Sequence, residues 1–228
     1  MTKPLILHYA PDNASFCVRL ALEELHLPYR TVLVDRATGG QKSADFLTLN
    51  PNGLIPVLET PHGPLFETGA ILLWLADRSG ILMPPPLDPA RGPALQWLIW
   101  LANTLHPTQR MLFYPDQYTA TAPEALRTRT RTRLTALFDL LESASQADWL
   151  DTEAPSAQGC YLGPLLRWPA LYGGQTDWFD LRRWPRLMRF AQSYEARPAA
   201  RRASDAEGLG PQPFSAPLPC HPPEGSAV

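Results

Sequence analysis

Apolar runs alternate with turn residues at the start of the chain in the order of a small α/β unit. Leu5–Leu7 is a short apolar run of the kind found in buried strands, and it stops at the turn signal 10–13. Apolar residues then recur on two faces of a helix from 16 to 25, and the β-branched segment 32–34 follows as a second strand. This order predicts a βαβ unit whose two strands run parallel.

The next segments predict a second half of the same sheet. The apolar run 54–58 has a strand pattern that Pro56 interrupts, so we expect this proline at a strand start or a bulge. The tight return 61–64 leads to a short hairpin partner at 65–66, and helical spacing follows from 70 to 78. Together the two halves predict a four-stranded mixed sheet with the order βαβ-ββα.

In the second half of the chain the pattern changes to helices, and no strand pattern appears. Apolar residues recur at helical spacing from 94 to 105, after which Pro107 is expected to kink or end the helix. A second long helix is predicted over 126–141, and shorter helical patches occur at 160–171 and 187–194. The C-terminal half is therefore predicted to be all-α.

Prolines mark the boundaries between these parts. The chain has 26 prolines in 228 residues, twice the usual ~5%. We divide it into an α/β domain at 1–80, a proline-rich linker at 81–92, an all-helical domain at 93–209 and a proline-rich tail at 210–228. The tail has few apolar anchors, so we assign it no secondary structure and expect it either to wrap the surface or to be mobile.

Composition and charge exclude several classes of protein. Hydrophobic residues make up 45% of the chain, and the 20 basic and 22 acidic residues nearly cancel, which argues against a general binder of nucleic acid or anionic membranes. Cys17, Cys160 and Cys220 are an odd number at wide spacing, which fits neither a disulfide framework nor a zinc or redox motif. The apolar run near the N-terminus is too short for a signal peptide. We therefore expect a soluble cytoplasmic protein.

Motifs in both halves of the chain occur in an order typical of one family. In the first half they are the segments 9–25, 50–58 and 67–71. In the second half they are 97–98, 103–106, 112–113, 166–168, 195–198 and 206–209. Over roughly residues 5–209 the chain resembles the glutathione transferases, and its helical half is similar to the bacterial beta class. The resemblance implies a thioredoxin-like βαβ-ββα domain and an all-helical partner domain, with glutathione as co-substrate, no metal, and a homodimer.

Two positions depart from the family pattern. The beta class typically has a cysteine in the first loop, where this chain has Ala14, and Cys17 falls three residues later within the predicted helix. Thiol exchange centred on a protein cysteine is therefore in doubt. The helical domain of the family usually has a capping box, but here Ser156 is followed at the third position by Gly159. One capping interaction is missing, which costs about 1 kcal/mol of local stability.

The chemistry that the resemblance implies requires an ionised thiol. Free cysteine has a pKa near ~8.5, and lowering a thiol pKa by about two units takes ~2.7 kcal/mol. A helix N-terminus contributes at most ~2 kcal/mol, and a hydrogen bond to a charged group ~1.5–3 kcal/mol, so the two together suffice. This points to the loop 11–15, where the Ser15 hydroxyl is our first candidate for a donor to sulfur and the Asn13 amide the second. The alternative is that either residue merely caps the helix.

The resemblance also implies the residues that hold glutathione. Pro56 corresponds to the cis-proline of the family, so that the backbone of Ile55 would pair with the cysteinyl part of glutathione. Glu67 would bind the γ-glutamyl ammonium, and the Thr68 hydroxyl with the helix start would bind its carboxylate. The alternative for both residues is a helix cap, and the two roles are compatible.

Further candidates come from both halves. His106 lies where the beta class has a histidine that reaches the sulfur, although a lone histidine is more often only packed. Arg36 or Lys42 would meet the glycyl carboxylate, unless each is an ordinary surface charge. Tyr9 matches a tyrosine of other transferase classes only loosely, and we expect it to pack at a strand end.

The resulting hypothesis is a detoxifying glutathione transferase that activates the thiolate for attack on a small apolar electrophile. Two alternatives remain open at this point. One is another glutathione-dependent activity, such as a lyase, reductive cleavage or peroxide reduction. The other is a protein with the transferase fold that has a binding or regulatory role. Nucleic acid and membrane are not expected among its partners.

Overall fold

A four-stranded mixed sheet forms the first part of the molecule, with the strand order β2-β1-β3-β4. The computed structural model describes residues 4–144, 147–151 and 154–227. β1 runs parallel to β2 and antiparallel to β3, and β3 forms a hairpin with β4. The strands are β1 (Leu5–Tyr9), β2 (Tyr29–Leu33), β3 (Val57–Thr60) and β4 (Gly63–Phe66). The predicted βαβ-ββα order and the mixed sheet are confirmed.

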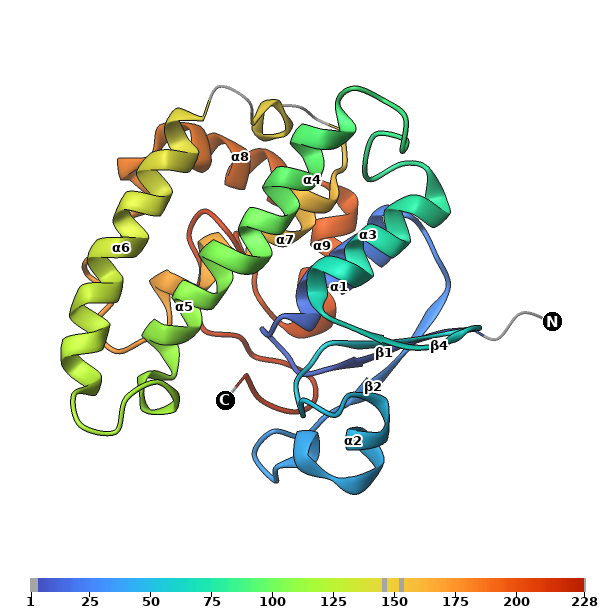
Figure 1. Cartoon of the computed structure of the whole chain (residues 1–228), viewed down its shortest axis with the longest axis horizontal. Coiled ribbons are helices and arrows are strands. Elements are labelled where there is room, and N and C mark those ends of the chain that lie inside the picture. The colour runs from blue at the N-terminus through green and yellow to red at the C-terminus, as the bar shows by residue number, and fades with distance from the viewer. Residues whose placement is uncertain (1–3, 145–146, 152–153, 228) are drawn as a thin grey trace.

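Helices cover both faces of this sheet (Figure 1). α1 (Ser15–Glu24) and α3 (Thr68–Ser79) lie together on one face, and the short α2 (Ala44–Leu49) lies on the other. The sequence pattern did not predict α2. It begins after a 3-10 turn, where the Ser43 hydroxyl accepts a hydrogen bond of 3.2 Å from Phe46 N.

β3 begins later than the sequence pattern predicted. The apolar run starts at residue 54, but the strand starts at Val57, so Pro56 precedes the ladder, where a missing N–H removes no strand hydrogen bond. The Ile55–Pro56 peptide bond is cis, as the resemblance implied. The backbone just before β3 therefore lies outside the sheet hydrogen bonding.

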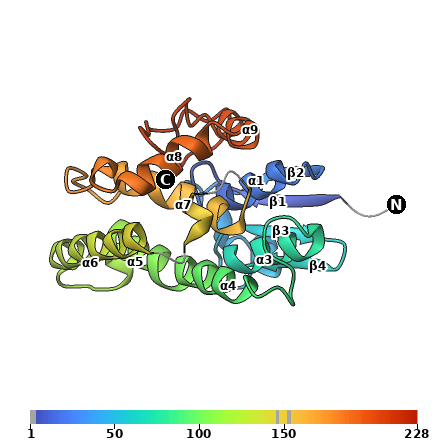
Figure 2. The ribbon, with the colours of Figure 1, turned by 90° about the horizontal axis from the view of Figure 1, so that it is seen from above.

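Between the sheet unit and the tail the described chain contains helices and no strand, as predicted. Seen from above, α7 lies between the layer of α4, α5 and α6 and the layer of α8 and α9 (Figure 2), and every described residue of α7 is buried. The helices are α4 (Arg91–Trp100), α5 (His106–Phe113), α6 (Pro123–Ser143), α7 (Ala157–Arg167), α8 (Pro185–Glu195) and α9 (Pro198–Glu207). Because α1 also packs against α7, one continuous core joins the sheet to the helices.

Pro107 does not end the helix that begins with α4. The chain stays helical from α4 through a π-helical segment, Leu101–Leu105, directly into α5, and Pro107 is the second residue of α5. Proline is tolerated in a first turn because its missing N–H has no partner to lose there. The wider π-helical turn accommodates the interruption, and it places His106 at the junction.

The structure at the start of α7 explains why Gly159 stands where the family usually has the second residue of a capping box. The Ser156 hydroxyl accepts the expected capping bond from Gly159 N at 2.9 Å. A side-chain carbon at residue 159 would lie 3.1 Å from the Ser156 hydroxyl and 3.4 Å from the Tyr194 ring. The side chain of a family-type capping box would therefore be crowded at this position.

The tail beyond α9 packs along the molecule without helix or strand in its described residues 210–227. Phe214 is fully buried against Gly163 of α7, and His221 N donates to Gly208 O at 2.8 Å. From there the tail returns toward the first loop of the sheet unit (Figure 1). Residues 1–3 and Val228, which belong to the predicted first domain and tail, lie outside the described residues. None of the described helices is both long and apolar enough to span a membrane.

Candidate functional site

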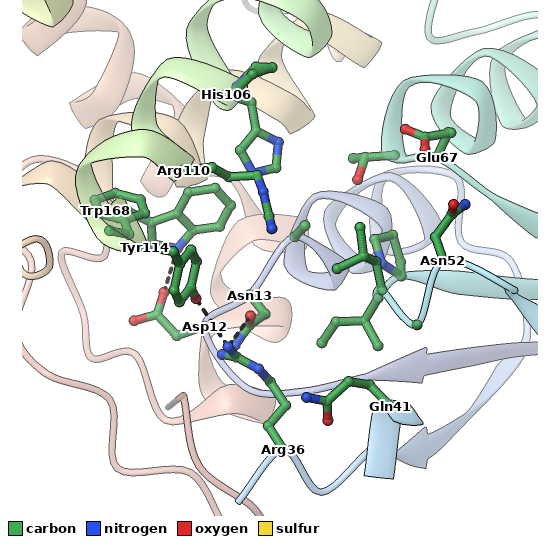
Figure 3. A pocket seen from close by; sticks show the side chains of 18 of the residues that line it. Asp12, Asn13, Arg36, Gln41, Asn52, Glu67, His106, Arg110, Tyr114 and Trp168 are labelled. Atoms are coloured by element: carbon green, nitrogen blue, oxygen red, sulfur yellow. Dashed lines mark hydrogen bonds between the residues drawn. The ribbon is translucent and has the colours of Figure 1, made fainter. Parts of the chain in front are cut away.

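A cavity of about 530 Å³ lies between the sheet unit and the helices. Its sheet-side wall comes from the first loop, the turn before β3 and the start of α3, and its other wall comes from α5 and the segment after α7 (Figure 3). Of the predicted site residues, the cavity is lined by Asn13, Arg36, Lys42, Ile55, Pro56, Glu67, Thr68 and His106. Residues far apart in the sequence therefore share one cavity.

Ser15 does not line this cavity, contrary to our first expectation. Its side chain is fully buried, and its hydroxyl donates to Ala10 O at 3.0 Å and accepts from Ala10 N at 3.3 Å. The Ser15 hydroxyl is therefore already hydrogen-bonded within the first loop, where it closes the turn that precedes α1. The reason is the position at which α1 begins: Ala14 is the capping residue, and Ser15 is already the first helical residue.

Asp12, Asn13 and Ala14 provide the part of the first loop that faces the cavity. The Asn13 amide nitrogen donates to Pro11 O at 2.9 Å and to Ala227 O at 3.1 Å, and its oxygen accepts from Arg36 at 3.1 Å. No side chain caps the N-terminus of α1. The partial positive charge of this helix end is thus available to an anion beside the loop.

The rest of the sheet-side wall comes from the segments before β3 and α3. The buried Asn50 side chain donates to Leu54 O at 2.7 Å and accepts from Asn52 N at 3.0 Å, which braces the turn that leads to Ile55. Glu67 has a φ of 69°, a conformation that non-glycine residues rarely adopt. Such strain is found where a surrounding structure fixes a functional backbone. The Glu67 side chain is exposed, and no ion pair to it occurs in the described part of the chain.

His106 is held by Tyr161 of α7. Its Nδ1 lies 3.0 Å from the Tyr161 hydroxyl, which is also hydrogen-bonded to the Thr68 side chain. Burial, and to a lesser extent the nearby charge of Arg110, lowers the pKa of His106 to about 4, so the ring is neutral near pH 7. Burial also raises the pKa of Tyr161, which keeps its proton. If that proton is donated to Nδ1, the ring carries its own proton on Nε2.

We expect the His106 ring to titrate with a midpoint near pH 4 by NMR, its signal being identified by its loss in His106→Asn. This pKa lies below the ordinary value of 6.5, so the stability that neutral His106 contributes is complete above pH 6.5 and is lost as pH falls through about 4. A measured midpoint of 6 or higher would contradict the burial argument, since ~6.5 is the value of a solvated ring.

The first loop is also fixed by a buried ionic network that sequence reasoning missed. Asp12 accepts two hydrogen bonds from Arg167, at 2.8 and 2.9 Å, one from Trp168 at 2.9 Å and one from Tyr172 at 2.5 Å. Its backbone N–H donates to Glu207 at 2.8 Å. The segment 166–168 was part of the family resemblance, but nothing in the sequence pattern paired it with Asp12.

Glu207 joins this network to α1. Its carboxylate lies 2.7 Å from Arg19 Nε, and both side chains are buried. Burial raises the pKa of Glu207 to about 7, while Arg19 and the Asp12 N–H oppose this shift. The ion-pair geometry favours the charged form of both groups. Two buried Asp/Glu–Arg pairs therefore clamp the first loop and α1 to the helical half.

The remaining candidates lie away from the cavity or at its edge. Tyr9 does not line it, and its hydroxyl donates to Glu224 of the tail. Cys17 and Cys160 are buried in the core, and burial raises the pKa of Cys160 to about 12. Cys220, half-buried in the tail, does not line the cavity either. The cavity wall thus contains no cysteine within the described residues.

Family models, curated proteins and solved structures were compared with this chain, and all three comparisons found similar proteins. The family model described as "Glutathione S-transferase, N-terminal domain" matches residues 4–77. The disulfide-bond oxidoreductase YfcG of Escherichia coli (strain K12) is 30% identical over 216 residues, which are 90% of this chain and 96% of that protein. A solved glutathione transferase homologue from Sulfitobacter with bound glutathione is 28% identical, with a TM-score of 0.77 over 89% of this chain and 97% of that chain. The beta class glutathione S-transferase of Sphingomonas chungbukensis is 29% identical, with a TM-score of 0.75 over 90% and 100%.

Proposed function

Because the chain belongs to the glutathione S-transferase family, as its motifs predicted, we propose that it binds glutathione in the cavity and activates its thiol for attack on an electrophile. The observation that carries this proposal is the meeting of Ile55, Glu67 and Thr68 with His106 around one cavity. The Sulfitobacter homologue with bound glutathione supports the choice of ligand.

The proposed orientation of the tripeptide rests on the residues that line the cavity. Glu67 binds the γ-glutamyl ammonium, and Thr68 with the start of α3 binds its carboxylate. The backbone of Ile55 pairs with the cysteinyl part, and Arg36 or Lys42 meets the glycyl carboxylate. The sulfur then lies near the start of α1, across the cavity from α5.

Donors other than Ser15 stabilise the thiolate in this arrangement. A neutral His106 with its proton on Nε2 donates one hydrogen bond to the anion, worth ~1.5–3 kcal/mol, and the N-terminus of α1 adds at most ~2 kcal/mol. Their sum reaches the ~2.7 kcal/mol needed to lower a thiol pKa by about two units. Asn13 remains a further candidate donor, because it lines the cavity and would free an N–H for the sulfur if its contact with Ala227 O were displaced.

In the proposed reaction the thiolate sulfur attacks an electrophilic carbon. A carbon–sulfur bond forms, and the leaving group departs with the electron pair of the bond that breaks. With 1-chloro-2,4-dinitrobenzene as a test substrate, the products are the aryl thioether of glutathione and chloride. The protein's part is to ionise the thiol and to hold both reactants together.

The experiment combines calorimetric titration with glutathione and conjugation of 1-chloro-2,4-dinitrobenzene. We expect binding, turnover, and thiolate absorbance of bound glutathione at a pH where the free thiol is protonated. Glu67→Gln should weaken glutathione affinity by roughly 10- to 100-fold, since one charge-assisted hydrogen bond contributes ~1.5–3 kcal/mol. Asp205→Asn, an exposed acidic residue of α9, should change nothing. Absence of both binding and turnover would favour a protein that has kept the fold without the activity.

A second activity has a specific observation in its favour. The E. coli relative of 30% identity is named a disulfide-bond oxidoreductase. In a glutathione-dependent reduction of a disulfide by this chain, the glutathione thiolate would attack the disulfide, the sulfur–sulfur bond would break, and a second glutathione would resolve the mixed disulfide to give glutathione disulfide and two thiols. Assaying the same protein with a small disulfide separates this activity from conjugation.

We further propose a division of the chain into four parts and its assembly into a dimer. Residues 1–80 form the glutathione-binding domain, 81–92 the linker, 93–209 the helical domain and 210–228 the tail. The family resemblance supports a cytoplasmic homodimer and a detoxifying role. Sedimentation analysis of the purified chain tests the dimer.

A further inference from the structure

Two guanidinium groups flank one aromatic ring on the helical side of the cavity. Arg110 of α5 lies 5.4 Å and Arg36 5.9 Å from the centre of the Tyr114 ring. The hydrogen bond of Arg110 goes to the neutral amide of Gln117, at 3.2 Å. Neither arginine forms an ion pair with a carboxylate among the described residues.

The acidic groups of the cavity do not neutralise this pair. Asp12 is engaged by Arg167 at 2.8 Å and belongs to the buried network. Glu67 lies on the opposite wall at the start of α3, while Arg110 and His106 extend into the cavity from α5 (Figure 3). The wall formed by α5 and Arg36 is therefore positively charged.

Glutathione accounts for only part of this charge. In the proposed orientation its glycyl carboxylate uses Arg36 or Lys42, and its other charged groups lie at Glu67 and Thr68. Arg110 is one helical turn beyond His106, on the side where Trp168 and Phe113 complete the wall. It lies on the helical wall of the cavity, and none of the charged groups of the tripeptide in this orientation is assigned to it.

We propose that the second substrate of this enzyme is an anion, an aromatic or apolar compound with a carboxylate that Arg110 binds. The inference rests on the proposed function and makes it more specific, because the sequence alone predicted an apolar electrophile. Arginine is suited to this role because its planar guanidinium binds a carboxylate through two parallel hydrogen bonds. The rings of Trp168 and Phe113 pack against the apolar part of the same molecule.

The test uses two product-like ligands that differ by one charge, S-(4-carboxybenzyl)glutathione and S-(4-carbamoylbenzyl)glutathione. Calorimetric titration of the full chain should show the acid binding about tenfold more tightly than the amide. Arg110→Gln should abolish this preference and Arg110→Lys should retain part of it. Arg129→Gln, on the exposed face of α6, is the matched control and should leave the preference unchanged. Added salt should reduce the preference.

Turnover gives an independent readout with 4-chloro-3,5-dinitrobenzoate and its amide. In both cases the thiolate displaces chloride, and the comparison uses the KM of each substrate because the acid and the amide also differ in intrinsic reactivity. We expect Arg110→Gln to raise the KM for the acid about tenfold and to leave the KM for the amide and the thiol pKa of bound glutathione unchanged.

The outcomes distinguish three situations. Equal binding of acid and amide, with glutathione itself still bound, would overturn the anionic substrate and leave the proposed function intact. An equal loss of turnover for both substrates in Arg110→Gln, with a raised thiol pKa, would assign Arg110 to the sulfur and also overturn the inference. Failure of the wild-type chain to bind glutathione would overturn the proposed function, and with it the inference.

Discussion

Replacing Arg167 by methionine should lower the free energy of unfolding by about 3–5 kcal/mol, the usual effect of removing one partner of a buried ion pair. Arg167 is fully buried, and it gives Asp12 two of its four side-chain hydrogen bonds, at 2.8 and 2.9 Å. It also donates to two carbonyls of the tail, Pro213 O at 3.2 Å and Leu218 O at 2.7 Å. The substitution leaves a buried carboxylate without its counter-ion and removes two hydrogen bonds to the tail. Urea unfolding measures the change.

The matched control is an arginine–aspartate pair on the surface. Arg182 lies 2.7 Å from Asp180, but both groups are exposed, so Arg182→Met should leave the urea midpoint within experimental error. Adding Asp12→Asn to Arg167→Met should recover part of the lost stability, because it removes the unpaired charge. An equal change in the free energy of unfolding for Arg167→Met and Arg182→Met would show that the buried pair stabilises the fold no more than the exposed pair.

A chain that ends at Gly225 should bind glutathione about tenfold more tightly than the full chain, if glutathione binds in the proposed orientation. In the structure Ala227 lines the cavity, and its carbonyl accepts hydrogen bonds from Arg36 at 2.6 Å and Asn13 at 3.1 Å. Arg36 is one of the two candidates for the glycyl carboxylate. A hydrogen bond to a charged group contributes ~1.5–3 kcal/mol, and glutathione must displace it. Calorimetric titration of the two chains gives the ratio.

A double-mutant cycle identifies the cause of the change. In an Arg36→Gln background the same truncation should alter glutathione affinity much less, because the displaced contact is already weakened. The truncated chain keeps Glu224 and its contact with Tyr9, so the rest of the tail stays anchored. Unchanged or weaker binding by the truncated chain would mean that Ala227 supports the site and does not compete for it.

Prediction from the sequence succeeded where a long segment repeats one pattern. The sheet order and the helical half follow from apolar periodicity, which reports burial along a whole element. α2 has six residues, and Phe46 is the one it buries, against Val34 and Val57. A helix this short forms because of that packing, which no local pattern reveals. The same holds for Pro107, whose place in a helix depends on the π-helical turn before it.

The part of the site that is built from recognisable backbone motifs was predicted from the sequence. Ile55, Pro56, Glu67 and Thr68 sit at a turn and a helix start whose residues are recognisable, and all four line the cavity. Ser15 was misplaced because the direction of its hydroxyl depends on where α1 begins, which sequence locates only to within a few residues. The Asp12 network was missed because its partners come from α7, the turn after it and α9, and only the fold brings these segments to the loop.

The clamp between Asp12, Arg19, Arg167 and Glu207 limits how this molecule can be engineered. Expressing the first 80 residues as a separate module would leave Asp12 and Arg19 without the charged partners that α7 and α9 supply. The loop that carries Asn13 would then lose the restraint that sets its shape. Grafting this unit onto another scaffold therefore requires transplanting the matching pair of helices as well, or redesigning both charges to neutral side chains.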